Sequence, residues 1–338
     1  MSVYTTGFLV KVIANLIRPS TFFLDRYFRQ EQLQETEEIH FDLINKKRRL
    51  APFVSPLVAG KIVQELGKTT NTFKPAYLKP KTPLAASGAL KRAVGEQIGG
   101  AMSAADRQLG RISSTLMDHV EQIDRRMEWM AVQSILNGSV TVSGDDYQTS
   151  VVDFQRDAAL TITLAGTDLW NDPLSKPLDD LQDWSLLMLQ KSGAPIVDVF
   201  LEIDGWKAFR SHADVEKRLD TRNVKDSVIM MGGPVDIGAT FMGVVDGFNI
   251  WTYVEWFEDD AGVEQPMLAS GEVLLGSAAI EGVRAHGAIN DVESGLQALA
   301  YFPKHKREWD PSADIILTQS APLPVPTRAN ASAKAQVL

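Results

Sequence analysis

One segment, residues 103–137, constrains the fold of this chain more than any other part of the sequence. Its apolar side chains recur every three to five positions, which is the spacing of one face of an α-helix. Ser103 followed by Asp106 is typical of a helix N-terminus, and Asn137-Gly138 is typical of a helix end. The pattern therefore predicts one helix of about 30 residues, which is about 45 Å long. The usual helix has about 11–12 residues, so the rest of the body must pack against this one long element.

The segments after this helix predict a mixed α and β body. Residues 138–164 alternate like a hairpin, and a helix is expected from Asp179 to Gly193. Asp246-Gly247 between two apolar runs is a strong hairpin signal. The elements expected in a second unit are a strand at 196–203, a turn at Asp204-Gly205, a helix at 206–219 and strands within 228–258, 273–275 and 283–285.

The basic residues are concentrated in one segment of an acidic chain. The sequence has 34 Lys and Arg against 43 Asp and Glu, a net charge of −9, yet residues 43–92 hold 11 basic side chains and one acidic side chain, Glu65. Prolines exclude a continuous helix in this segment. We predict an extended ribbon with strands at 58–66 and 71–78 and a polar tip at 67–70. Because a lone hairpin is marginal in water, its own body or another subunit must hold it.

Two functions fit such a ribbon. Cations interleaved with aromatic rings suit a nucleic-acid arm, and the same charges suit an arm that lies across an acidic neighbour. Residues 101–338 carry 19 basic and 35 acidic side chains, so a second identical copy supplies that neighbour, and we favour this interpretation. Such a head-to-tail contact closes into rings or shells. The residues expected to make it are Arg48, Lys61, Lys68, Phe73, Lys74, Tyr77, Lys79 and Lys81.

Nothing in the sequence points to a catalytic site. There is no cysteine, and no two histidines stand three or four positions apart, which excludes the common zinc motifs. His119 is expected to be satisfied on the long helix, and the neighbouring aspartate pairs are typical of turns. Phosphate-binding and nucleophile motifs are absent. We therefore expect no catalytic residue, cofactor or metal, although a soluble α+β enzyme with a dispersed site remains an alternative.

The start of the chain predicts a short amphipathic helix. The apolar stretch from Gly7 to Ile17 is interrupted by Lys11 and Asn15 and is too short to cross a bilayer. It also lacks the features of a signal peptide. Its apolar spacing favours a helix ending before Pro19, packed either on its own domain or on a partner.

Short motifs stand in a fixed order along most of the chain. The most specific block comprises Gly205, Trp206, Phe209, Arg210, Ser211, Val215 and Leu219 followed by Asp220, Thr221 and Arg222. Supporting motifs are Val54-Ser55-Pro56 with Gly60, Phe73 with Pro75, Tyr77 and Lys79-Pro80-Lys81, Val152-Asp153 with Arg156, Tyr301 with Pro303 and Lys304, Asp310-Pro311, and residues 319–323. As an ordered set they resemble the lambda-type family of tailed-phage major capsid proteins.

The resemblance implies an α+β architecture, the tailed-phage major capsid (Johnson) fold. That fold has an N-terminal arm, an extended β-hairpin loop, a peripheral domain with a long spine helix, and an axial domain. Mapped onto this chain, the arm is 1–36, the extended loop 44–92, the peripheral domain 37–43 and 93–193 with its spine helix at 103–137, and the axial domain 194–300. The chain would return to the peripheral domain over 301–326 and end in a flexible tail, 327–338.

The resemblance also implies a function. Members of the family form hexamers and pentamers that assemble into an icosahedral shell around double-stranded DNA. The implied partners are further copies of the chain, a scaffolding protein, a portal and a small decoration protein at threefold positions, with weak DNA contacts that are not sequence-specific. The implied location is the virion, assembled in the bacterial host cytoplasm, with no membrane partner. No motif for covalent Lys–Asn cross-linking is found, and an encapsulin-type compartment shell is the alternative within the fold.

Overall fold

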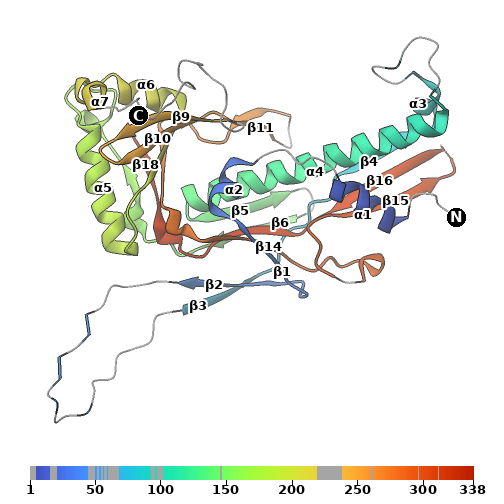
Figure 1. Ribbon diagram of the computed structural model, residues 1–338, viewed down its shortest axis with the longest axis horizontal. Coiled ribbons are helices and arrows are strands. Elements are labelled where there is room, and N and C mark those ends of the chain that lie inside the picture. Colours follow the sequence, from blue (N-terminus) through green and yellow to red (C-terminus); the bar gives the residue numbers. More distant parts are fainter. Residues whose placement is uncertain are drawn as a thin grey trace.

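The computed structural model describes most of the chain. The described residues are 5–15, 21–44, 50–51, 53–54, 56, 59, 68–92, 96, 102–144, 147–218, 238–259, 262–295, 297–310 and 312–338. Figure 1 shows an elongated molecule in which a long helix connects a helix-covered sheet at one end with a narrow sheet at the other.

The predicted long helix is confirmed as α4, Ala104–Leu136. Its first turn is closed by a capping box, in which the Asp106 amide donates to Ser103 Oγ at 3.1 Å and the Ser103 amide donates to Asp106 Oδ2 at 3.2 Å. At its end Gly138 adopts a left-handed φ of 67°. The predicted apolar stripe is buried from Ile112 onward, while Leu109 stays 39% exposed.

The first hydrophobic cluster surrounds α4. The elements that pack there are α1 (Thr6–Asn15), α2 (Phe22–Tyr27), the hairpin β5 (Ser139–Gly144) and β6 (Tyr147–Asp153), and two three-stranded sheets. One sheet has the order β1 (Gln30–Leu33), β14 (Gly282–His286), β17 (Pro322–Pro326); the other has β15 (Phe302–Glu308), β16 (Ala313–Gln319), β4 (Lys81–Ala85), with α3 (Ser87–Leu90) beside it. Both the predicted N-terminal helix and the hairpin are confirmed, and Leu9 and Ile13 pack α1 onto its own chain.

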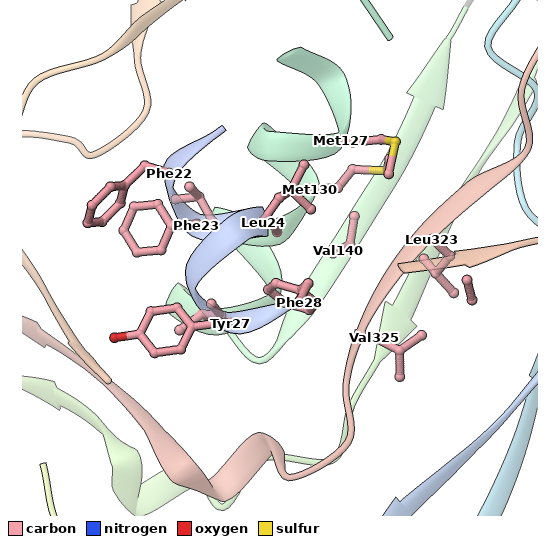
Figure 2. Close-up of a cluster of buried hydrophobic side chains, with 14 of the residues drawn as sticks. Phe22, Phe23, Leu24, Tyr27, Phe28, Met127, Met130, Val140, Leu323 and Val325 are labelled. Carbon is pink, nitrogen blue, oxygen red and sulfur yellow. The ribbon is translucent and has the colours of Figure 1, made fainter. Parts of the chain in front are cut away.

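Short helix α2 fills the middle of this cluster with aromatic side chains. Figure 2 shows Leu24 and Phe28 directed toward residues of α4, β5 and β17, whereas the rings of Phe22 and Tyr27 point away from them, toward Phe200. The side chains of Phe22, Phe23, Leu24, Tyr27 and Phe28 are all at most 5% exposed. Residues 21–28, assigned above to an arm, are therefore part of the body of the molecule.

The second cluster lies between a six-stranded sheet and three helices. The sheet has the order β7 (Thr161–Thr163), β18 (Ser332–Gln336), β13 (Glu272–Gly276), β8 (Asp198–Leu201), β10 (Phe248–Tyr253), β9 (Ala239–Val245), and the helices are α5 (Pro177–Ser192), α6 (Ile203–Arg210) and α7 (Ala213–Arg218). The β9–β10 turn is confirmed at Asp246-Gly247, whose φ values of 47° and 88° match a type I′ turn. The cluster begins at Leu160, so the boundary expected between residues 193 and 194 falls inside it.

The predicted flexible tail is wrong. Residues 332–336 form β18, which lies between β13 and β7, one strand in from the edge of the sheet. Ala333, Ala335 and Val337 are fully buried in the second cluster. The small side chains that suggested a loose tail are the ones that allow this strand to fit between its neighbours.

The helix expected at 206–219 is also wrong in its limits. Glu202 Oε2 accepts hydrogen bonds from the amides of Asp204 at 2.9 Å and Gly205 at 3.3 Å, so these two residues open α6 instead of forming a turn. The helix ends at Arg210, and α7 follows as a separate element.

The ribbon pairs differently from the prediction. β3 (Lys68–Phe73) is antiparallel to β2 (Ile39–Ile44), with Ile39 opposite Phe73 and Ile44 opposite Lys68. The tip expected at 67–70 therefore overlaps a strand, and most of the predicted strand 58–66 lies outside the described residues. β2 and β3 run away from the body toward the lower left of Figure 1. A smaller hairpin joins β11 (Trp256–Glu258) to β12 (Glu264–Pro266) beside α4.

Candidate interaction surfaces

The stem of the ribbon is anchored on one face and polar on the other. Ile39, Phe41 and Leu43 alternate along β2 and are at most 8% exposed, because they enter the first cluster. On the opposite face His40 Nδ1 lies 2.9 Å from Thr72 Oγ1, one of several polar cross-strand contacts. The core therefore fixes the base of the ribbon, while its outer face has no apolar cover.

The structure describes the side chains of five of the eight residues predicted to make the ribbon contact. Arg48 and Lys61 lie outside the described residues, and Lys68 is described only as the first residue of β3. Phe73 and Tyr77 are half-buried, and Lys74, Lys79 and Lys81 are exposed. No partner chain is present, so their contacts with a second copy stay predictions.

Two of these lysines have partners within the chain. Lys74 Nζ lies 2.7 Å from Glu37 Oε1 in an ion pair whose side chains are 58% and 41% exposed. Lys79 Nζ lies 4.7 Å from the ring centre of Tyr77, whose hydroxyl donates to the carbonyl of Ala288 at 3.1 Å. Exposed pairs of this kind contribute little to stability, so both cations remain accessible to another charged group.

A hollow of about 580 Å³ opens at the base of the ribbon, beside α4 and β5. Aromatic side chains line it, and its cations Lys79 and Arg126 each stack on a ring, Arg126 at 5.7 Å from Trp129. A second hollow of about 760 Å³ shares Arg126 and Trp129 and continues to the β11–β12 hairpin. There four carboxylates, Glu255, Glu258, Asp259 and Glu264, outnumber two cations, Arg125 and Arg126, of which Arg125 pairs with Glu255 at 3.2 Å. The exposed face of α4 thus runs between a basic, aromatic hollow and an acidic one.

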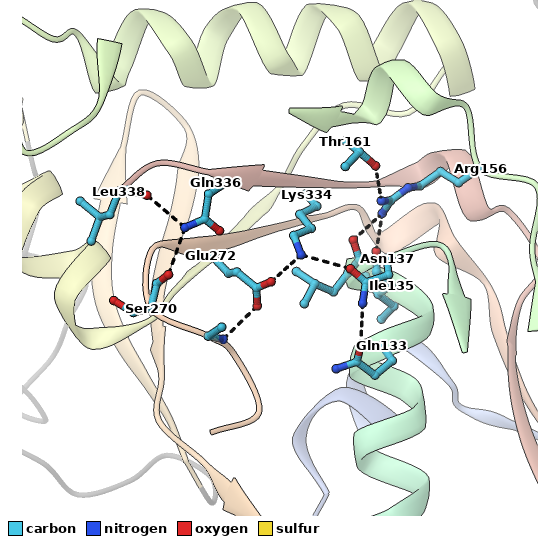
Figure 3. Close-up of polar contacts among 12 residues, drawn as sticks. Gln133, Ile135, Asn137, Arg156, Thr161, Ser270, Glu272, Lys334, Gln336 and Leu338 are labelled. Atoms are coloured by element: carbon cyan, nitrogen blue, oxygen red, sulfur yellow. Dashed lines mark hydrogen bonds and ion pairs between the residues drawn. The ribbon is translucent and has the colours of Figure 1, made fainter. Parts of the chain in front are cut away.

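Partly buried polar contacts hold the C-terminal end of α4. Arg156 Nη1 donates to the carbonyls of Ile135 and Leu136, both at 2.8 Å, so it satisfies two of the carbonyl groups at the helix end (Figure 3). Burial lowers the pKa of Arg156 to about 10. Lys334 of β18 donates to Asn137 Oδ1 at 3.2 Å and forms an ion pair with Glu272 of β13. The helix end is therefore attached directly to the six-stranded sheet.

Two buried carboxylates attach α2 to separate parts of the body. Glu128 of α4 accepts the amides of Phe23 at 2.7 Å and Leu24 at 3.0 Å, so it caps α2 from 104 residues away in the sequence. Asp198 of β8 accepts from Arg26 at 2.6 and 3.0 Å and from Tyr27 at 2.8 Å. Burial raises the pKa of Glu128 to about 7, although the two amides act in the opposite direction.

The motif block singled out in the sequence divides into core and surface residues. Trp206 and Phe209 are buried in the second cluster, where the ring centre of Phe209 lies 5.3 Å from that of Trp170. Arg210 and Ser211 are exposed. Asp220, Thr221 and Arg222 lie outside the described residues. Trp206 and Phe209 therefore hold α6 on its sheet.

Sequence reasoning missed the exposed aromatic at the far end of the molecule. Trp309 follows β15 at the tip of the β15–β16 hairpin and is 93% exposed. Leu90 of the neighbouring α3 is 79% exposed. The position of Trp309 directly before the Asp310-Pro311 motif was the available signal, because a tryptophan beyond the end of a strand has no strand face to enter. Large exposed apolar side chains close together are typical of contact surfaces.

Metal-ligand clusters and membrane-spanning helices are two further kinds of feature that the described residues can be compared with. Within the described residues, no group of three or more His, Asp or Glu side chains is placed to hold a metal ion. His119 is buried and contacts the Thr82 hydroxyl at 2.9 Å and the Thr318 hydroxyl at 3.1 Å, as expected of a satisfied helix histidine. No described helix combines the length and apolar character that a membrane crossing requires.

Comparison with known proteins gives consistent matches over nearly the whole chain. The family model described as phage major capsid protein E matches residues 5–337. The major capsid protein of Enterobacteria phage P21 is 31% identical over 96% of both chains, and that of Escherichia phage lambda is 29% identical with the same coverage.

Solved structures share the fold. A prophage protein from E. coli CFT073, described as a capsid protein, has a TM-score of 0.78 at 20% identity and covers 99% of both chains. The capsid of Ralstonia phage GP4 has a TM-score of 0.54 at 14% identity, covering 95% of this chain and 92% of that one. The predicted α+β capsid fold is confirmed.

Proposed function

The chain belongs to the family of phage major capsid protein E, and on that premise we propose that its copies join head to tail, each reaching across its neighbour with the ribbon whose stem is β2 and β3. Residues 81–90 of the expected loop 44–92 form β4 and α3 and belong to the body. Proteins of this family build the shell of the phage head, so the chain is a structural protein of the virion that assembles with itself. The observation that supports the ribbon contact is its stem, which is fixed by Ile39, Phe41 and Leu43 at its base and polar on its outer face.

Charge complementarity supports a second copy as the partner. The segment between β2 and β3 has Lys46, Lys47, Arg48, Arg49 and Lys61 against the single acid Glu65, whereas residues 101–338 have 16 more acidic than basic side chains. The acidic hollow beside the β11–β12 hairpin is one surface of suitable sign. An arm that meets the next identical subunit is a heterologous contact, and closure of such contacts gives rings.

The finer assembly scheme that we propose is the one that the family resemblance implies. Rings of six and five copies form an icosahedral shell around double-stranded DNA, with a scaffolding protein, a portal and a decoration protein as partners and the host cytoplasm as the place of assembly. The peripheral domain centres on α4, and the axial domain centres on the six-stranded sheet, now with residues 158–192 and 332–336 included. DNA contacts are weak because the acidic body offers few phosphate partners. The role is mechanical, with no catalytic step.

Reversing the charge of the four basic residues 46–49 tests the ribbon contact. The variant with Lys46, Lys47, Arg48 and Arg49 changed to Glu should fold normally but yield at least about tenfold fewer closed particles, because like charges then face each other across the contact. Negative-stain microscopy and sedimentation measure the yield, and circular dichroism checks the fold.

A charge-preserving control sharpens this test. Exchanging Lys for Arg and Arg for Lys at the same four positions keeps the net charge and should leave particle yield near that of the unchanged chain. Particles at normal yield from the charge-reversed variant would rule out the ribbon contact. If those particles also lost retained nucleic acid, the ribbon would be a nucleic-acid arm instead.

The exposed Trp309 predicts a second contact between copies. Because the side chain is 93% exposed, Trp309→Ala should change the free energy of unfolding by less than about 0.5 kcal/mol. Burial of a tryptophan at a contact is a frequent source of binding energy, so the same change should reduce closed shells several-fold in a sedimentation assay. Trp309→Phe, which keeps a ring, should retain more assembly than Trp309→Ala; equal yields from all three chains would exclude the contact.

A further inference from the structure

Residues 21–28, here called the clasp, are wedged between the two halves of the molecule. A Cβ placed on Gly276 of β13 would lie 2.5 Å from the Tyr27 hydroxyl, and one on Gly282 of β14 would lie 2.4 Å from the Phe28 ring. These two glycines leave the space that the clasp occupies. On the same side as Gly276, the ring of Phe23 lies 4.8 Å from that of Phe200 of β8, measured between ring centres.

Besides the contacts of Arg284 of β14 with the Phe28 carbonyl and the Asp25 carboxylate, the clasp has one attachment through a buried carboxylate to each half. Asp198 of the six-stranded sheet holds its second turn through Arg26 and Tyr27. Glu128 of α4 holds its first turn, where Thr21 stands at the N-cap position but makes no side-chain cap. The two attachments differ in chemistry, because Asp198 has a guanidinium partner and the described contacts of Glu128 are with neutral groups.

The surroundings of Glu128 largely shield it from water while the clasp is in place. Glu128 is 6% exposed. A cavity of about 310 Å³ lies beside it, lined by Thr21, Leu24 and Asp25 of the clasp and by Asp124 and Met127 of α4. The titratable and charged groups that face Glu128 from neighbouring elements are Asp25 of α2, Tyr253 of β10 and Arg284 of β14. Separation of α2 from α4 would join Glu128 to this polar cavity.

We propose that the clasp links α4 to the six-stranded sheet and that protonation of Glu128 controls this link. The clasp stays attached to α4 while Glu128 carries a proton, and it separates more readily once Glu128 ionises. Opening here means separation of the first turn of α2 from α4 with the global fold retained. The device goes beyond assembly itself, since it would let pH alter how the two halves of one copy sit against each other.

The direction follows from linkage. In the closed state the pKa of Glu128 is about 7, against 4.5 for a glutamate in water. The closed state is therefore favoured most below pH 4.5, and this advantage is lost as the pH rises through 7. A difference of about 2.5 pKa units corresponds to a total rise of about 300-fold in the opening equilibrium, of which about 140-fold falls between pH 4.5 and pH 8. Above pH 7.5 the opening equilibrium should be nearly independent of pH.

Hydrogen exchange of the clasp amides tests the proposal on the full-length chain. The exchange rates of peptides covering residues 22–27, divided by the intrinsic rate at each pH, give the opening equilibrium from pH 5 to pH 8. For the unchanged chain we expect a rise of about 70-fold across this range. For Glu128→Gln, which cannot ionise, we expect a flat profile.

Glu121→Gln is the matched control, because Glu121 is an exposed glutamate on the same helix. It should keep the full rise. A change of less than about threefold in the unchanged chain would overturn the proposal, even if Glu128→Gln did not fold. A rise that persisted in Glu128→Gln would assign the effect to another group and overturn it equally. Neither result depends on particle formation, so the ribbon contact is tested separately.

Discussion

A chain that stops at residue 331 is expected to leave the six-stranded sheet unformed. β18 pairs with β13 over five residue pairs and with β7 over three, so its loss exposes unpaired backbone groups on both neighbours. Each such hydrogen bond contributes about 1 kcal/mol net, and removing the buried Val337 side chain costs about 2 kcal/mol more. The sum is comparable with the roughly 5–15 kcal/mol that stabilises a whole domain.

Circular dichroism, limited proteolysis and thermal unfolding of the truncated chain measure this effect. Lys334→Ala is the matched control, because it removes the ion pair with Glu272 and keeps the strand. A synthetic peptide of residues 330–338 should restore protease resistance by adding the missing strand in trans. Cooperative unfolding of the truncated chain near the temperature of the full chain would contradict the expectation.

Elements that depend on neighbouring residues could be predicted from the sequence. The limits of α4 follow from Ser103, Asp106 and Asn137, all within one helical turn of the ends they define. The β9–β10 turn follows from Asp246-Gly247 alone, because both backbone angles require residues that tolerate positive φ.

Elements that depend on distant partners could not be predicted. β18 is a short run of small and polar residues, and only the slot between β13 and β7 makes it a strand. The sequence predicts that β3 pairs with the nearest strand-like segment, 58–66. Its partner in the structure is β2, because Ile39, Phe41 and Leu43 alternate along β2 and become buried in the core. Tertiary burial decided both cases over local pattern.

The same distinction separates the candidate surfaces. The charge of residues 43–92 is a property of sequence, and it drew attention to the ribbon without structural information. Glu128 and Asp198 gave no such signal, because a single carboxylate in an amphipathic helix or a short strand looks like an ordinary polar residue. Their roles depend on amides and side chains more than 100 positions away.

Removing the Asp198 side chain is expected to destabilise the fold more than any other single truncation of a polar side chain discussed above. Asp198 is 2% exposed and accepts hydrogen bonds from Arg26, Tyr27, Asn249 and Trp251, at distances from 2.6 to 3.3 Å. Asp198→Ala leaves a partly buried guanidinium and three other donors without their acceptor. Loss of one partner from a buried ion pair costs about 3–5 kcal/mol.

A double-mutant cycle separates the ion pair from the rest of the network. Asp198→Ala and Arg26→Ala, alone and combined, should show a coupling energy of at least about 1 kcal/mol in chemical denaturation, because each change removes the same contact. Asp25→Ala is the control on the same helix: its pair with Arg284 has a 2.6 Å contact but Asp25 is 57% exposed, so its loss should cost under about 1 kcal/mol. Additive effects of the two alanine changes, or an Asp198→Ala cost no larger than that of Asp25→Ala, would show that aromatic packing alone holds the clasp on the sheet.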